Sequence, residues 1–233
     1  MSNQVKKINN FDDVVINISK WMRESDSAHI YVLTDSAQKS IVERELLTRL
    51  LQEQKQDDGS YLPFATMQIS VETPDSLAIG YLDGKDEVAI NEELTPLKRI
   101  ELVKASLHDH LDDLKAFKKS AKRYGFVTQL ANLFEQFEDD GVTSADLEAF
   151  THKALGDGLV SKLNDVLVVF TDFENKVKLQ KLSTRASKLA KLAEFIQAKN
   201  NDDFKNSHVA IVNFANPCGM EKQLFKTFEN VAA

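Results

Sequence analysis

The sequence predicts an α/β fold in which a small parallel β-sheet with flanking helices is interrupted by a large all-helical insertion. Runs rich in β-branched and aromatic residues are typical of buried strands, and they occur at residues 28–34, 66–71 and 208–214. A helical pattern separates the first two runs, and strands that alternate with helices pair in parallel because each needs a crossover connection. Between the second and third runs the pattern is helical throughout. We therefore expect an α/β domain at residues 1–73 and 205–233 and a helical insertion at residues 74–204.

Two amphipathic helices are expected before the second strand. Asp12 or Asp13 can cap the first helix. Its apolar side carries Val14, Val15, Ile18, Trp21 and Met22. Asp35 or Ser36 can cap the second, which extends to about Gln54. Its inward residues are expected to be Ala37, Ile41, Leu47, Leu50 and Leu51.

The long middle block has the pattern of a series of helices. We expect them at residues 74–82, 95–123, 126–138, 144–154, 159–177 and 184–198. The most informative stretch is residues 124–150, where Gly141 can supply a left-handed C-cap and Thr143 with Asp146 forms a capping-box pattern. This stretch is expected to be a helical hairpin. A last helix, after residue 217, carries Met220, Leu224, Phe228 and Val231.

Composition limits the classes of function. The chain has no run of about 18 apolar residues and no basic-then-apolar leader, so we expect no membrane segment and a cytoplasmic location. Cys218 is the only cysteine, which excludes an internal disulfide and an iron–sulfur cluster made by this chain alone. The net charge of −7 argues against a protein that coats nucleic acid, although it can hide local basic surfaces.

Nucleotide hydrolysis is the first chemistry to test, because many helicase motor domains are parallel sheets interrupted by helical insertions. A phosphate-binding loop needs the pattern G-x-x-x-x-G-K-[ST], but the Gly84-Lys85 pair is followed by Asp86. The third strand ends at Asn213 and Phe214 without a carboxylate to hold magnesium. We therefore expect a degenerate fold of the helicase or P-loop NTPase type, without ATP turnover.

The remaining reactive side chains suggest no site. Cys218 lies in an Asn-Pro-Cys-Gly turn without a signature that ties it to a particular histidine. His108 and His110 are two residues apart on an expected helix, so they point in different directions. We assign no catalytic, cofactor-binding or metal-binding residue to the chain.

Two basic runs are the candidates for DNA-binding residues. The first contains Lys115, Lys118, Lys119, Lys122 and Arg123. In the second, Lys181, Arg185 and Lys188 fall at i, i+4 and i+7, so they form one stripe if their helix begins early enough. The alternative for both runs is a solvated lysine-rich face, which the preference for cations at a helix C-terminus would favour in the first.

Three segments together resemble the N-terminal region of the B subunit of ATP-dependent helicase/nuclease, of the AddB/RexB type. They are LTPLKRIELVKASLHDHLDDLKAFKKSAKRYGFVTQLANLFEQFEDDGVTSADLEAF, LVSKLNDVLVVFTDFENKV and HVAIVNFANPCGMEKQLF. The first is similar to the family's run from a Leu-Thr opening through a Gly-Phe helix to a "PEDL"-like segment. The second is similar to its Leu-x-x-Lys-Leu-x-Asp-Leu helix, and the third to its His-Ile-x-Val-Asp-Gly-Phe strand. Their order and spacing agree over most of the chain.

The resemblance implies a non-catalytic, helicase-like N-terminal domain. In that family the B subunit pairs with a motor subunit, and the complex unwinds and resects double-stranded DNA ends for recombinational repair. The family's iron–sulfur cluster and magnesium belong to a C-terminal nuclease part, so no cofactor is expected in this chain. Where some relatives keep a phosphate loop near the start, this chain has the polar stretch at residues 4–11. The alternative is a stand-alone protein-interaction domain whose Leu224, Phe225 and Phe228 bind a protein partner and never DNA.

Overall fold

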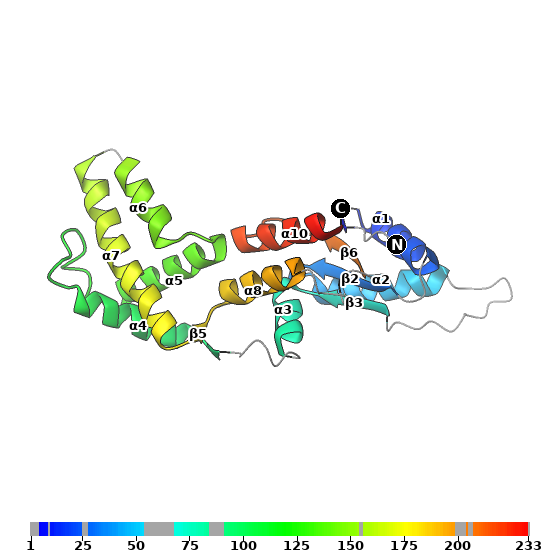
Figure 1. Cartoon of the computed structure of the whole chain (residues 1–233), viewed down its shortest axis with the longest axis horizontal. Coiled ribbons are helices and arrows are strands. Elements are labelled where there is room, and N and C mark those ends of the chain that lie inside the picture. The colour runs from blue at the N-terminus through cyan, green and yellow to red at the C-terminus, as the bar shows by residue number, and fades with distance from the viewer. Residues whose placement is uncertain are drawn as a thin grey trace. The chain divides into compact units, whose positions relative to one another are not determined.

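The structure is a computed structural model that describes residues 5–8, 10–24, 28–53, 68–83, 91–153, 156–198, 204 and 207–232. The chain forms two compact units, whose elements are labelled in Figure 1. We call residues 1–86 with 188–233 the sheet unit and residues 87–187 the helical unit. The boundaries of these units do not coincide with the domain boundaries predicted after residues 73 and 204, which stay a prediction. In the structure α3 (Pro74–Asp83) and most of α8 (Arg185–Gln197) belong to the sheet unit.

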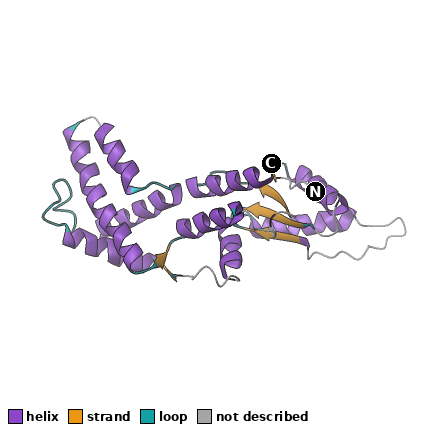
Figure 2. Ribbon diagram, viewed as in Figure 1, coloured by secondary structure: helices purple, strands orange, loops and turns teal. Residues whose placement is uncertain are grey.

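The sheet unit contains a four-stranded sheet in the order β1-β6-β2-β3, with every neighbouring pair parallel. The strands are β1 (Val5–Ile8), β2 (His29–Thr34), β3 (Ile69–Glu72) and β6 (Ser207–Val212), shown in orange in Figure 2. Val209 of β6 pairs with Val5 on one side and with Tyr31 on the other. Strands from both ends of the sequence therefore form one sheet. A mostly helical chain with a small parallel sheet agrees with the predicted α/β class.

The strand predictions need two corrections. The third strand ends at Val212 and not at residue 214, because Asn213 has a positive φ of 57° that breaks the extended conformation. β1 was missed because Lys6 and Lys7 make its sequence polar. As an edge strand it tolerates these side chains, and Lys7 forms an ion pair with Glu229 at 3.2 Å. Residues 66 and 67, predicted for the second strand, lie outside the described residues.

Two helices, α1 (Phe11–Glu24) and α2 (Lys39–Glu53), share a hydrophobic core with one face of the sheet. The predicted inward residues of α1 are buried, except that Met22 is partly buried. The prediction for α2 was wrong at Ile41 and Leu47, which are 47% and 38% exposed. The stripe of α2 that reaches the sheet runs through positions four residues apart, so Ile41 and Leu47 fall to either side of it. Leu50 is buried as predicted, whereas Val42 and Leu46 are core residues that the prediction omitted, and the side chain of Leu51 lies outside the described residues.

Aromatic side chains build the other face of the sheet. Tyr31 contacts Phe204 at 5.4 Å between ring centroids, and Phe204 contacts Phe228 of α10 (Gly219–Ala232) at 5.6 Å. Tyr81 of α3 also stacks on Phe204, at 4.6 Å. Leu224, Phe225 and Phe228 are therefore core residues with at most 3% exposure. This corrects the interpretation of these three residues as an exposed surface for a protein partner.

The helical unit is built mainly from α4 (Pro96–Asp109), α5 (Tyr124–Asp140), α6 (Ser144–Lys153) and α7 (Asp157–Leu179). Phe134, Phe170 and Phe173 are fully buried at its centre. The predicted hairpin is present: Gly141 ends α5 with φ 72°, and the Asp146 side chain accepts the Thr143 backbone N–H at 2.9 Å. Hydrogen bonding by Thr143 holds the pKa of Asp146 below its ordinary value.

Two predictions for this unit were wrong. The helix expected at residues 95–123 ends at Asp109, and residues 110–123 form turns instead. The unit is also not entirely helical, because β4 (Glu92–Glu93) pairs in parallel with β5 (Leu182–Ser183). Backbone hydrogen bonds across this pair join the segment before α4 to the segment after α7.

Candidate nucleic-acid interface

The first predicted basic run lies on a compact loop, residues 110–123, which we call the basic loop. Its apolar residues face the helical unit: Leu114 and Ala121 are buried, and Phe117 contacts Phe126 at 5.1 Å between ring centroids. Turn hydrogen bonds close its second half, including those from the Ser120 and Ala121 backbone N–H groups to the Phe117 carbonyl, at 2.8 and 2.9 Å. The loop is therefore folded against the helices and carries its own core residues.

Asp165 of α7 holds the first half of the basic loop. Its carboxylate accepts hydrogen bonds from three consecutive backbone N–H groups. The Lys115 nitrogen lies 3.0 Å from Oδ1, and the nitrogens of Ala116 and Phe117 each lie 2.8 Å from Oδ2. Asp165 is only 4% exposed. Sequence reasoning missed it, although an aspartate within the apolar run of α7 was an available signal, since such a residue is rarely buried without a partner.

The basic side chains of this loop are exposed. They are Lys115, Lys118, Lys119, Lys122 and Arg123. Lys118 forms an ion pair with Asp112 at 2.9 Å, and this contact holds the pKa of the Asp112 carboxyl below its ordinary value. Tyr124, the first residue of α5, follows directly and is 73% exposed. The loop thus carries five exposed cations within nine residues, followed directly in sequence by the exposed ring of Tyr124, which the sequence analysis did not single out.

The second basic run does not form the predicted stripe. α7 ends at Leu179, Lys181 has a positive φ of 51°, and α8 begins only at Arg185, so Lys181 is not on that helix. Arg185 forms an ion pair with Asp139 of α5 at 3.4 Å. Arg185 and Lys188 are three residues apart on α8 and therefore lie on the same side of that helix. The structure thus keeps the first basic run on one folded loop, whereas in the second run Lys181 lies outside the helix that carries Arg185 and Lys188.

The positions where a motor domain would bind nucleotide have no matching chemistry in the described part of the sheet unit. β1 ends at Ile8 and α1 begins at Phe11, so only the sequence Asn9-Asn10 separates them. A phosphate-binding loop needs several more residues, with glycines and a lysine. Asn213, not a carboxylate, follows β6. Cys218 is half-buried, and its backbone N–H donates to the Glu221 carboxylate at 2.9 Å.

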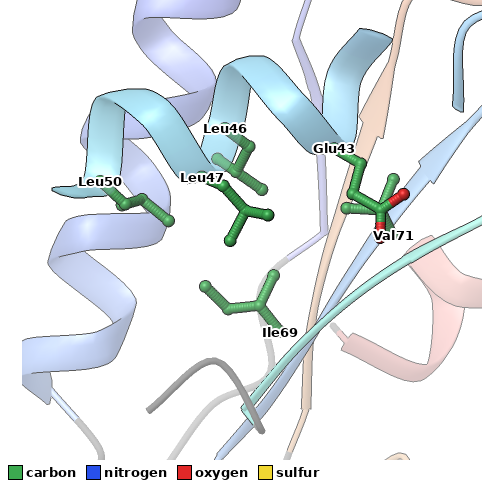
Figure 3. A pocket seen from close by; sticks show the side chains of 6 residues that line it. All are labelled: Glu43, Leu46, Leu47, Leu50, Ile69 and Val71. Carbon is green, nitrogen blue, oxygen red and sulfur yellow. The ribbon is translucent and has the colours of Figure 1, made fainter. Parts of the chain in front are cut away.

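A small apolar crevice lies between α2 and β3. Figure 3 shows its lining, in which Glu43, Leu46, Leu47 and Leu50 come from α2 and Ile69 and Val71 from β3. Its volume of about 130 Å³ is below the ~300–1,000 Å³ usual for small-molecule sites. Within the described ranges, no cluster of three or more His, Cys, Asp or Glu side chains is placed to hold a metal ion. None of the helices described is both long and apolar enough to cross a membrane.

These features define a class of protein: a mostly helical chain with a small parallel sheet and a separate helical unit that carries a cationic loop. Residues 91–230 match the family described as ADDB, N-terminal, and the chain belongs to this family. The matched range includes the helical unit from α4 onward, the basic loop, β6 and most of α10. The resemblance that the three sequence segments indicated is thereby confirmed.

Curated relatives carry the name of the B subunit of ATP-dependent helicase/deoxyribonuclease. The protein of Levilactobacillus brevis is 28% identical over 142 residues, which cover 58% of this chain and 12% of the relative. That of Latilactobacillus sakei is 26% identical over 217 residues, covering 92% of this chain and 17% of the relative. That of Listeria welshimeri is 35% identical over 77 residues, which cover 32% of this chain and 6% of the relative. The chain thus matches only a small part of each relative's length.

Proposed function

We propose that this chain is the non-catalytic, helicase-like N-terminal domain of the B subunit of a helicase/nuclease. We assign it three tasks: binding double-stranded DNA ends, docking the motor subunit, and supporting end resection during recombinational repair of double-strand breaks. The observation that carries the proposal is the basic loop: exposed lysines gathered on a folded element, in a chain whose net charge is −7. Clustered lysines on one surface are the usual means of binding phosphates.

The non-catalytic part of the proposal rests on the sheet unit. Its parallel strands agree with a motor-like ancestry, while the short β1–α1 connection and the asparagine after β6 lack the groups that bind triphosphate and magnesium. The proposal assigns no cofactor to this chain. ATPase activity that stays with the purified chain, and that a substitution within it abolishes, would contradict this part.

Among the predicted DNA-binding residues, we assign the main role to Lys115, Lys119 and Lys122. Lys118 is already paired with Asp112, and Arg123 is the N-cap residue of α5. Arg185 and Lys188 on α8 remain candidates for one contact, and Lys181, which lies outside that helix, for a separate one. The exposed ring of Tyr124 lies next to this cluster in the sequence and offers a stacking surface for an unpaired base at a DNA end.

Replacing Lys115, Lys119 and Lys122 together by glutamine is expected to weaken binding to a fluorescently labelled forked duplex and to flatten its salt dependence. Each lost phosphate contact lowers the slope of log K against log salt by about 0.9, so the triple variant should lose ~2–3 in slope. Fluorescence anisotropy at several salt concentrations measures both quantities.

The matched control for this variant replaces Lys104, Lys153 and Lys162, which are exposed on α4, α6 and α7. It removes the same charge from the same unit and should leave the slope close to that of the natural chain. An unchanged slope in the basic-loop variant would contradict DNA binding by that loop. No binding at low salt by the natural chain favours the protein-interaction alternative.

A further inference from the structure

Asp165 is a buried carboxylate in a part of the helical unit whose other buried residues are mostly apolar. Its neighbours along α7 include the core residues Val166, Val169 and Phe170. Removing a carboxylate from water is unfavourable unless hydrogen bonds replace its hydration. Here the backbone N–H groups of Lys115, Ala116 and Phe117 supply that replacement. The hydrogen bonds that replace the hydration of the Asp165 carboxylate therefore come from a loop that is distant in the sequence, and they constrain the backbone of that loop.

The contact fixes the part of the loop that contains Lys115 and immediately precedes Lys118 and Lys119. Three consecutive N–H groups that converge on one carboxylate leave those residues little conformational freedom. Lys115 is itself one of the three donors, and Phe117 is packed on Phe126 immediately before Lys118 and Lys119. A loop whose backbone is fixed before binding loses less conformational entropy when DNA arrives. Asp165, although buried, thus holds the backbone next to the exposed lysines in one conformation.

We propose that Asp165 is a positioning residue for DNA binding by the basic loop. The inference rests on the proposed function, because it presumes that Lys115, Lys119 and Lys122 contact phosphates. Charge alone would give Asp165 the opposite role, since a carboxylate near these lysines weakens their attraction for phosphate. The two effects therefore predict opposite signs when the carboxylate is neutralised, and the sign separates positioning from simple electrostatics.

The test compares Asp165→Asn with Asp112→Asn in the same chain. Both remove one negative charge near the basic loop, but Asp112 is exposed and forms its ion pair with the Lys118 side chain. Asparagine at position 165 replaces one carboxylate oxygen with an N–H₂ group, so the hydrogen bond that Oδ1 accepts from the Lys115 N–H at 3.0 Å is lost, and the remaining oxygen is neutral and a weaker acceptor. We expect Asp165→Asn to bind the forked duplex about tenfold more weakly, a change equivalent to ~1.4 kcal/mol. Asp112→Asn should bind as tightly as the natural chain or more tightly. Equal or tighter binding by Asp165→Asn overturns the inference.

Hydrogen exchange supplies a readout that does not depend on DNA. The backbone N–H groups of residues 115–117 should be protected in the natural chain and should exchange much faster in Asp165→Asn, while those of α5 and the core of α7 keep their protection. If protection in α5 and α7 is lost as well, Asp165→Ser, which keeps one small acceptor, takes the place of the asparagine variant. Unchanged protection of residues 115–117 in a folded variant also overturns the inference.

Failure of the inference can be told apart from failure of the proposed function. If the Lys115, Lys119 and Lys122 variant binds DNA like the natural chain, the proposed DNA surface is wrong, whatever Asp165→Asn does. If that triple variant loses binding and Asp165→Asn does not, the surface is right and Asp165 does not position it. Loss in both, with Asp112→Asn unimpaired, supports both statements.

Discussion

Replacing Arg99 by methionine is expected to destabilise the helical unit by about 3–5 kcal/mol at neutral pH, because it leaves a buried carboxylate without its partner. The Arg99 side chain is 6% exposed and forms an ion pair with Glu138, which is itself 15% exposed. The guanidinium also lies 5.8 Å from the centre of the Phe173 ring. Denaturant unfolding followed by hydrogen exchange in α4 and α5 measures the loss, and the emission of the single tryptophan, Trp21, checks that the sheet unit stays folded.

The effect of this substitution should depend on pH with a defined sign. Burial raises the pKa of Glu138 above its ordinary value of 4.5, and Arg99 opposes that rise. A carboxyl with a raised folded pKa stabilises the fold most below its unfolded pKa, and that stabilisation is lost as the pH rises through the folded pKa. Without Arg99 the folded pKa should rise further. The difference in stability between variant and natural chain should therefore shrink as the pH is lowered from neutral toward 4.5.

The double variant Arg99→Met with Glu138→Leu is the control. Replacing both members of a buried ion pair by apolar side chains often changes the free energy of unfolding very little. The double variant should therefore recover most of the stability lost by Arg99→Met and should show little of its pH dependence. A double variant as unstable as the single one would mean that the methionine damages packing around Phe173, and that the unpaired carboxylate is not the cause.

Truncating Phe134 to alanine should cost the helical unit a similar amount, about 3–5 kcal/mol. Phe134 is fully buried and contacts Phe170 at 4.8 Å and Phe173 at 5.4 Å between ring centroids. The substitution removes apolar burial and leaves a cavity bounded by aromatic rings. The matched control is Phe150→Ala, because Phe150 of α6 is 58% exposed and should change stability by less than about 0.5 kcal/mol. Equal losses in the two variants, measured by denaturant unfolding, would contradict the assignment of Phe134 to the core.

Patterns confined to neighbouring residues predicted much of this fold. The periodicity of α1 identified its buried face, and the capping residues Gly141 and Thr143 identified the α5–α6 hairpin. Both signals are local, because caps and amphipathic faces depend on residues a few positions apart. Features set by distant contacts were missed. β1 becomes a strand only because β6, from the far end of the sequence, pairs with it.

The candidate site shows the same division. The basic residues of the loop were visible in the sequence, but residues 95–123 were predicted as one helix because nothing local marked its end at Asp109. The first half of the loop is held by Asp165, which is far away in the sequence, so no short window around the lysines includes this contact. The stripe predicted through Lys181 failed for a local reason, since Lys181 adopts a left-handed conformation before α8 starts.

The lysines of β1 have a consequence for self-association. Another molecule that added a strand beside β1 would have to desolvate the ammonium group of Lys7 or separate it from Glu229. Lys6 is likewise engaged, with its Nζ donating to the Asn17 side-chain oxygen at 2.6 Å. The two lysines that made β1 look polar in the sequence thus also oppose the addition of a strand from another molecule at this edge of the sheet.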